Sequence, residues 1–215
     1  SNRIVIKVGS SLLINEKNGY IDIVWLKSFV KDICELNKKN KSILIVSSGS
    51  IALGRKQLNL KKSLSLDEKQ AAAAVGQINL SHAWKEFFKS VNITTAQILL
   101  APDDTETRKK HLNARATLEK LLQFNIIPVI NENDTVSTQE IKFGDNDRLA
   151  ARVVQICSAD LLILLSDIDG LYTADPTLNK KSKFIDEIDN ITNEIEKMAG
   201  PSNTFYSSGG MTTKI

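Results

Sequence analysis

Cysteine is scarce in this chain of 215 residues, which contains only Cys34 and Cys157. Neither has a partner at the spacing of a structural zinc site, and two thiols do not make the disulfide framework of a small secreted protein. Both side chains are therefore predicted to be core thiols. For Cys34 this is supported by its position on an apolar helical stripe. This usage favours a reducing compartment, and we expect a cytoplasmic protein.

Long apolar runs and aromatic clusters are missing as well. No segment approaches the ~20 apolar residues that a membrane helix needs, and we expect no secretory leader. Aromatic residues make up 6% of the chain, the lysines are scattered and the net charge is only +3. We therefore expect no membrane and no nucleic-acid partner. The slight positive charge is weak support for an anionic ligand.

Two common phosphate-binding fingerprints are absent too. The chain has no G-x-x-x-x-G-K-[ST] sequence, and no G-x-G-x-x-G follows its first apolar segment. Both motifs wrap backbone N–H groups around phosphates at a strand-to-helix turn. Their absence disfavours a P-loop nucleotide hydrolase and a dinucleotide-dependent oxidoreductase.

What the chain does contain is an alternation of short apolar runs and longer segments of helical periodicity. Predicted strands cover residues 3–8, 42–46, 93–101, 126–130 and 161–165, and predicted helices lie at 21–37, from 67, through 112–122, from 147 and at 185–198. Long crossovers between strands are typical of a mainly parallel sheet covered on both faces. The sequence therefore predicts an α/β fold, a three-layer αβα sandwich with a mainly parallel central sheet.

Polar residues gather on both sides of one segment near the middle of the chain. Asn131, Asn133 and Asp134 directly follow the apolar run 126–130, and the sequence 144–147 (GDND) precedes a predicted helix. A single Asp at such a helix start is ordinarily a cap. Two clusters exceed what one turn and one cap require, and the carboxyl ends of parallel strands share one edge of the sheet. We expect these groups to converge on a polar ligand, such as an amino acid or a metal-phosphate.

Two further strand ends resemble phosphate sites. Residues 7–11 (KVGSS) combine a lysine, a glycine and hydroxyls, and residues 47–49 (SSG) open a predicted helix. Glycine lets backbone N–H groups approach an anion closely. A solvated strand-end lysine and a serine cap remain the alternatives at these two places. Together the loops suit phosphoryl transfer, in which a protein chiefly positions reactants and neutralises charge.

The segments VIKVGSS, SSGSIALG, INENDTVSTQEIKFGDND, LLSDIDGLYTADP and GGMTTK occur in this order over nearly the whole chain. In this combination the sequence resembles the amino acid kinase family. Within the family it is most similar to members that use ATP to phosphorylate the γ-carboxylate of L-glutamate, the first step of proline biosynthesis. The resemblance implies the carbamate kinase-like fold of the family and an enzyme with ATP and Mg²⁺ as cofactors.

Roles for individual residues follow from the same resemblance. It implies that Lys7 and Lys214 neutralise the transferring phosphoryl group and that Asp147 orients both lysines. The residues implied to bind glutamate are Ser48, Asp134 and Asn146. Those implied to bind phosphate or nucleotide, besides the two lysines, are Gly9, Gly49, Ser166, Asp167, Ser208, Gly209, Gly210, Met211, Thr212 and Thr213. The ion would be held by the phosphates and water, so no protein metal site is expected.

The resemblance also implies an organisation and partners. We expect one kinase domain over 1–215, with a glutamate-binding lobe to about residue 150 and a nucleotide-binding lobe from about 151 that lacks its last elements. No C-terminal RNA-modification-like domain is expected. A homodimer or tetramer and feedback inhibition by proline are implied as well. The alternatives are a relative acting on acetylglutamate, aspartate, carbamate or UMP, and a non-catalytic sensor of amino acids or nucleotides.

Overall fold

The computed structural model describes residues 1–15, 17–61, 63–136, 146–199, 211 and 214–215. Its main sheet has five strands in the order β3-β4-β2-β1-β5, and every pairing is parallel. The strands are β1 (Arg3–Val8), β2 (Ser42–Ser47), β3 (Thr95–Leu100), β4 (Ile127–Glu132) and β5 (Leu161–Leu165). The predicted, mainly parallel central sheet is confirmed.

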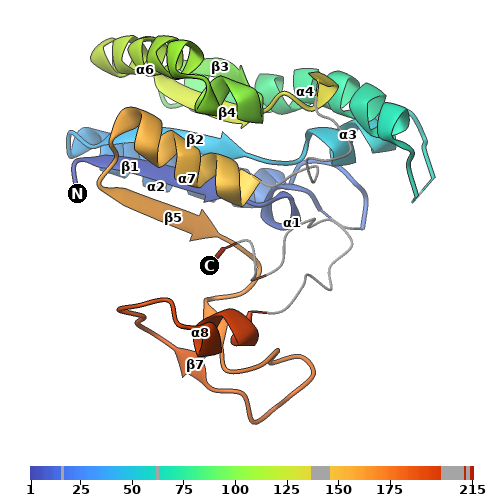
Figure 1. Ribbon diagram of the computed structural model, residues 1–215. Helices are drawn as coiled ribbons and strands as arrows, with labels where there is room; N and C mark the ends of the chain where they lie inside the picture. The colour runs from blue at the N-terminus through green and yellow to red at the C-terminus, as the bar shows by residue number, and fades with distance from the viewer. Residues whose placement is uncertain (16, 62, 137–145, 200–210, 212–213) are drawn as a thin grey trace.

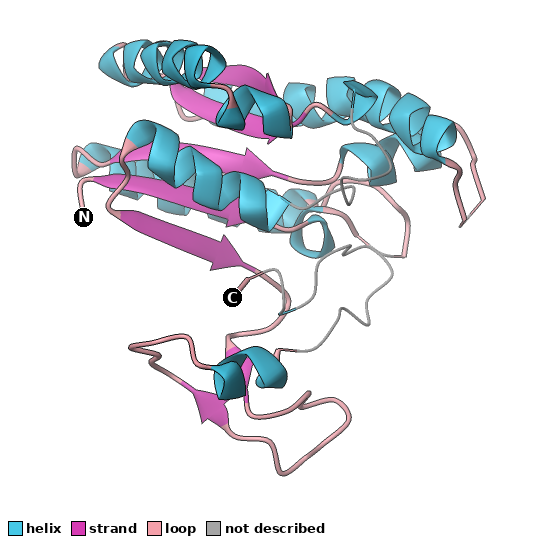
Figure 2. Cartoon of the chain, in the orientation of Figure 1, coloured by secondary structure: helices cyan, strands magenta, loops and turns pink. Residues whose placement is uncertain are grey.

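Helices cover both faces of this sheet (Figures 1 and 2). Side chains of β1 alternate between two cores: Ile4 and Ile6 pack with α2 (Ile23–Lys38) and α4 (Leu66–Lys89), whereas Val5 packs with α6 (Arg108–Gln123) and α7 (Asn146–Cys157). Because successive strand residues point to opposite faces, a strand buried on both sides is apolar throughout. The predicted three-layer sandwich is therefore confirmed.

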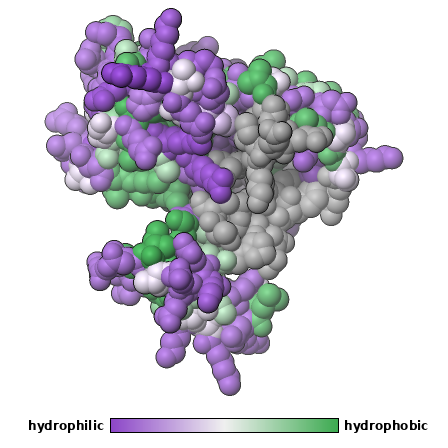
Figure 3. Space-filling view, in the orientation of Figure 1, coloured by the Kyte–Doolittle hydropathy of each residue, from purple (hydrophilic) through white to green (hydrophobic). Residues whose placement is uncertain are grey.

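Short elements connect or follow these layers. They are α1 (Ser10–Leu13), α3 (Ser50–Gln57), α5 (Pro102–Glu106), the 3₁₀ turn η1 (Asp134–Val136), β6 (Leu171–Tyr172), β7 (Phe184–Ile185) and α8 (Asn193–Met198). The antiparallel pair β6–β7 and α8 lie below the edge strand β5 in Figure 1. Side chains of β5 are only partly buried, and Figure 3 shows apolar side chains along this edge.

Helix α4 begins where its sequence predicts. The Ser65 hydroxyl accepts a hydrogen bond from the Glu68 N–H at 3.4 Å, and the Glu68 carboxylate accepts one from the Ser65 N–H at 2.9 Å. This reciprocal cap satisfies two N–H groups that have no partner inside the helix. Asp67 and Glu68 in the first turn also suit the helix dipole. None of the described helices combines the length and apolar character that a membrane crossing requires.

Two expectations from the sequence need correction. The predicted helix at 185–198 is wrong, because the segment begins with β7 and becomes helical only in α8. Ile185 pairs with Leu171 in the antiparallel β6–β7 ladder, and the neighbouring Phe184 packs on Tyr172 with ring centroids 5.4 Å apart, so the start of the segment is extended. Cys157 is a buried core thiol as predicted, whereas Cys34 is only half-buried.

Helices α3 and α4 approach each other through two glycines. A Cβ atom on Gly76 would lie 1.8 Å from the Ser50 carbonyl oxygen, and one on Gly54 would lie 1.7 Å from the Ala72 carbonyl oxygen. Both gaps are far below van der Waals contact, so no larger residue fits without separating the helices. The contact fixes the start of α3 against the middle of α4.

The first prediction concerns this contact. Gly76→Ala is expected to lower the free energy of unfolding by roughly 1–3 kcal/mol or more, since the added methyl group meets backbone rather than a movable side chain. Urea denaturation measures the change. Lys85→Ala, at an exposed position of the same helix, should shift stability by no more than about 0.5 kcal/mol. Equal stability of the two variants would contradict the packing argument.

Candidate active site

A carboxylate lies between two lysines at the carboxyl edge of the sheet. Asp147 stands in the first turn of α7, and its Oδ1 atom is 2.8 Å from the Nζ atom of Lys7, near the end of β1. Its Oδ2 atom is 2.8 Å from the Nζ atom of Lys214. The side chains of Lys7, Asp147 and Lys214 are only 10%, 4% and 14% exposed. Residues separated by more than 200 positions thus meet in one buried ion-paired group, the lysine–aspartate triad.

The electrostatics of the triad keep its carboxylate ionised. Burial by itself would raise the pKa of Asp147, but attraction to Lys7 and hydrogen bonds from both lysines outweigh burial and hold the pKa below its ordinary value. Two ammonium groups and one carboxylate leave one excess positive charge. Such a group, largely screened from water, attracts an anion more strongly than an exposed lysine does.

A row of side-chain amides begins next to the triad. The Asn146 Nδ2 atom donates to the Ser48 hydroxyl at 2.8 Å and to the Asn131 Oδ1 atom at 3.1 Å. Asn131 in turn donates from Nδ2 to the Gln77 Oε1 atom on α4 at 2.8 Å. Asn131 and Asn146 are both buried, and the Asn146 Oδ1 atom has no hydrogen-bond partner among the described residues. These three side chains, Asn146, Asn131 and Gln77, form the amide row. The row ends beside the triad in the Asn146 Oδ1 atom, which can accept a hydrogen bond from a ligand.

Asp134 lies in η1, just beyond the end of β4, and is also buried. The Ser50 hydroxyl donates to its Oδ2 atom at 3.1 Å. Burial, together with the nearby charge of Glu132, raises the pKa of Asp134 to about 7, although the bond from Ser50 opposes the shift. A carboxyl group in this setting is stabilised by a cation, because a positive partner favours the ionised form.

Two glycine turns complete the edge of the sheet. Gly49 caps α3 with a φ angle of 115°, a left-handed conformation that favours glycine, and leads into the first N–H groups of the helix. A Cβ atom on Gly9 would lie 3.7 Å from the Lys7 Nζ atom and 3.5 Å from the Leu165 carbonyl oxygen. The Gly9 turn therefore brings backbone close to the predicted phosphate-binding lysine.

Ser166 and Asp167 follow β5 at the same edge. Pairing of Val8 with Leu165 places this strand end beside the Gly9 turn. The Ser166 hydroxyl donates to the Asp167 carboxylate at 3.0 Å, and Asp167 is exposed. Met211 is half-buried. The remaining predicted nucleotide residues, Ser208, Gly209, Gly210, Thr212 and Thr213, lie outside the described residues, as does the whole segment between η1 and α7.

Some residues of the site differ from the sequence expectation. Asn133 does not join the amide row; its side chain accepts a hydrogen bond from the Thr135 hydroxyl at 2.6 Å. Ser50 and Gln77 do contact the row or Asp134, yet the sequence did not single them out. Ser50 directly follows the predicted SSG turn, which was the available signal. A glutamine on a helix carries no comparable signal.

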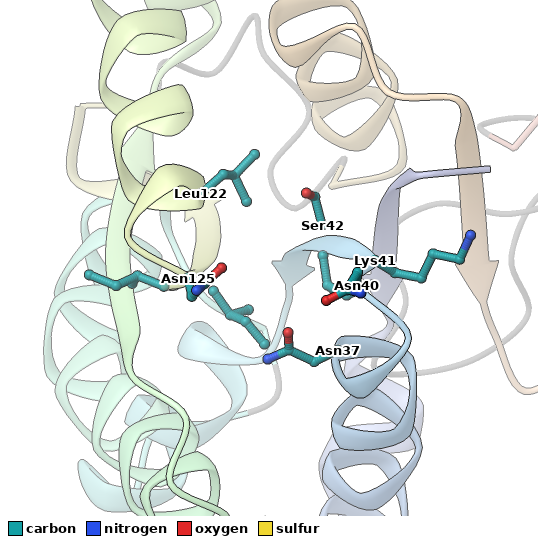
Figure 4. A pocket seen from close by; sticks show the side chains of 9 residues that line it. Asn37, Asn40, Lys41, Ser42, Leu122 and Asn125 are labelled. Atoms are coloured by element: carbon teal, nitrogen blue, oxygen red, sulfur yellow. The ribbon is translucent and has the colours of Figure 1, made fainter.

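A separate cavity of about 110 Å³ lies away from these residues, between the starts of β2 and β4. Figure 4 shows Asn37, Asn40 and Asn125 around it. None of the predicted site residues that the structure describes lines it. Among the described residues, no three His, Cys, Asp or Glu side chains are grouped as a metal site would require.

The raised pKa of Asp134 predicts how stability depends on pH. A carboxyl group whose pKa is higher in the folded state stabilises that state below its unfolded pKa of about 4, and this contribution is lost as pH rises through about 7. Relative to Asp134→Asn, the ligand-free wild type should lose roughly 2–4 kcal/mol of unfolding free energy between pH 5 and pH 8. Denaturation at both pH values measures the difference, and parallel pH profiles would contradict it.

Known proteins similar to this chain agree with its architecture. The model of the amino acid kinase family matches residues 2–215. Among solved structures, the UMP kinase of Bacillus anthracis has a TM-score of 0.56 at 16% identity, over 85% of this chain and 72% of that one. At this level of identity the match indicates a shared fold only.

Curated relatives are much more similar in sequence. A glutamate 5-kinase of Paramagnetospirillum magneticum is 52% identical over 215 residues, and one of Rhodopseudomonas palustris is 56% identical over 214 residues. These alignments take in 100% and 99% of this chain but 58% and 57% of the relatives. The chain thus spans little more than half the length of the curated relatives it matches. Because the family model matches nearly every residue, the chain belongs to the amino acid kinase family.

Proposed function

We propose that the protein is a glutamate 5-kinase, which transfers the γ-phosphoryl group of ATP to the γ-carboxylate of L-glutamate. The observation that carries this proposal is the lysine–aspartate triad directly beside a buried group of neutral amides and one carboxyl group. The first part suits a transferring phosphoryl group and the second an amino acid. The 52–56% identity to glutamate 5-kinases supports the choice of substrate.

In this mechanism the triad acts on the phosphoryl group. One oxygen of the glutamate γ-carboxylate forms the new bond to phosphorus while the bond to ADP breaks, and negative charge accumulates on the oxygens in between. Lys7 and Lys214 neutralise that charge, and Asp147 holds both lysines in place. Pre-positioned charges of this kind lower the barrier because no solvent has to reorganise during the reaction.

Recognition of glutamate uses the neighbouring groups. Asp134 binds the substrate ammonium group, which favours the ionised carboxylate despite its burial. Asn146 and Ser48 bind the substrate through hydrogen bonds. An acetylated amine carries no charge for Asp134 to bind, so acetylglutamate is expected to be a poor substrate and serves as a control in the assays below.

On the nucleotide side, backbone N–H groups at Gly9 and Gly49 face phosphate oxygens, as do the two lysines. Ser166, Asp167 and the segment from Ser208 to Lys214 hold the nucleotide. Mg²⁺ is bound mainly by the nucleotide phosphates and water, as this ion prefers. That assignment fits the residues present, because both oxygens of Asp147 already contact lysines.

The wider organisation is part of the proposal. Residues 1 to about 150 form the glutamate-binding lobe, and residues from about 151 contribute the nucleotide-binding lobe of the same kinase domain. The protein acts in the cytoplasm in proline biosynthesis, as a homodimer or tetramer, and proline inhibits it.

Substitution of Lys7 tests the phosphoryl-transfer role. In the whole protein, with ATP, Mg²⁺ and L-glutamate, trapping by hydroxylamine should give a hydroxamate that depends on glutamate. Lys7→Ala is expected to lower kcat by roughly 10²–10³-fold, the effect of losing one pre-positioned charge contact. Lys31→Ala, at an exposed position of α2, is the matched control. Activity that survives Lys7→Ala, or a wild type that turns over acetylglutamate equally well, would contradict the proposal.

Substitution of Asp134 tests recognition of the ammonium group. Asp134→Asn keeps the size of the side chain and removes its charge, so KM for glutamate should rise roughly tenfold or more while KM for ATP changes little. In the wild type, KM for glutamate should fall as pH rises through about 7, because the ionised carboxylate is the binding form. The variant should lack this pH dependence. A KM for glutamate that is unchanged in Asp134→Asn would rule out the assigned role.

A further inference from the structure

We propose that Gln77 is a positioning residue for glutamate recognition. It fixes the donor and acceptor ends of the amides in the row, so that the Asn146 carbonyl oxygen faces the substrate ammonium group. This inference rests on the proposed function and adds to it a residue of α4. Gln77 is half-buried, and its side-chain hydrogen bonds among the described residues are made with Ser81 and Asn131. Its effect would therefore pass through Asn131 and Asn146.

The row has a defined direction. At its outer end, the Gln77 Nε2 atom donates to the Ser81 hydroxyl at 3.1 Å, which turns the Gln77 carbonyl toward Asn131. Asn131 donates to that carbonyl at 2.8 Å and accepts from Asn146 at 3.1 Å. Each amide has one donor end and one acceptor end, so the orientation of one side chain constrains the next.

Hydrogen bonds at both ends of the Asn131 amide fix its orientation. The Glu132 N–H donates to its Oδ1 atom at 2.9 Å, and Gln77 accepts from its Nδ2 atom. The other partner of that Nδ2 atom is the Ser50 hydroxyl, at the longer distance of 3.4 Å. Without the Gln77 acceptor, the buried N–H group would draw Asn131 toward Ser50 and away from Asn146, because a buried donor without a close partner is unfavourable.

The inner end of the row points to the chemistry of the ligand. Asn146 is 3% exposed. Among the described residues, its side chain donates hydrogen bonds from Nδ2 to Ser48, to Asn131 and to the Ser47 carbonyl at 3.3 Å. Its Oδ1 atom has no partner among the described residues. A buried carbonyl oxygen of this kind needs a donor, and an ammonium group is a strong one. Asp134 supplies the opposite charge for the same group.

Packing of α4 against α3 fixes the position of Gln77. The preceding residue, Gly76, lies against the Ser50 backbone in the tight contact between α3 and α4. Ser50 itself donates to Asp134. One turn of α4 therefore supports both halves of the ammonium site, Asp134 through Ser50 and Asn146 through Asn131.

The test compares glutamate with glutarate, which has both carboxylates and no ammonium group. In the whole protein, Gln77→Met removes the acceptor at similar size and helix propensity. It should raise KM for L-glutamate roughly tenfold, the effect expected for one hydrogen bond of ~1.4 kcal/mol. The inhibition constant of glutarate and kcat should each change less than about threefold. Loss of affinity for both compounds alike, or for neither, would overturn the inference.

A second pair of variants separates direction from packing. Gln77→Glu still offers Asn131 an acceptor and should keep the preference for glutamate over glutarate within about threefold of wild type. Gln77→Lys offers only donors and should lose the preference for glutamate over glutarate. This variant provides the test if Gln77→Met does not fold. Gln123→Met, at an exposed position of α6, is the matched control. If the unsubstituted protein does not turn over glutamate, the proposed function is overturned first, and this inference with it.

Discussion

The structure depends on one electrostatic arrangement, the carboxylate of Asp147 between the ammonium groups of Lys7 and Lys214. Burying charges is unfavourable unless each has a partner, and here one carboxylate serves two cations at 2.8 Å. The excess positive charge remains at the carboxyl edge of the sheet. The end of β1, the start of α7 and Lys214 meet at this point, which concentrates the charge there.

Asn146 and Asp147 are consecutive residues, yet their side chains contact different groups. An α-helix turns by about 100° per residue, so neighbouring side chains at a helix start point in different directions. Asp147 contacts the lysines, whereas Asn146 contacts Ser48 and Asn131. The start of α7 therefore separates a cationic region, suited to phosphate, from a neutral region beside Asp134. This separation matters because the lysines would repel an ammonium group placed next to them.

Local sequence patterns predicted the sheet more completely than the contacts that support the site. Buried parallel strands are continuous apolar runs, so five strands and both helix layers followed from the pattern. Asp134 and Asn146 were identifiable because they flank a strand end and a helix start. Gln77 was not, since its partner Asn131 is 54 residues away and the bond depends on tertiary packing. The segment 185–198 was mispredicted because acidic content alone does not specify a helix.

The contacts that support Asn146 and Asp134 are made by neutral side chains, and this affects the charges beside them. A carboxylate in place of Asn131, which is 2% exposed, would act on Asp134 through a low-dielectric interior and raise its pKa further. It would also compete with the substrate for attraction by the lysines. An amide orients its neighbours through its dipole without adding charge. Hydrogen bonds between neutral amides can therefore fix the orientation of the Asn146 carbonyl from α4. The charge that selects the ligand is supplied by Asp134.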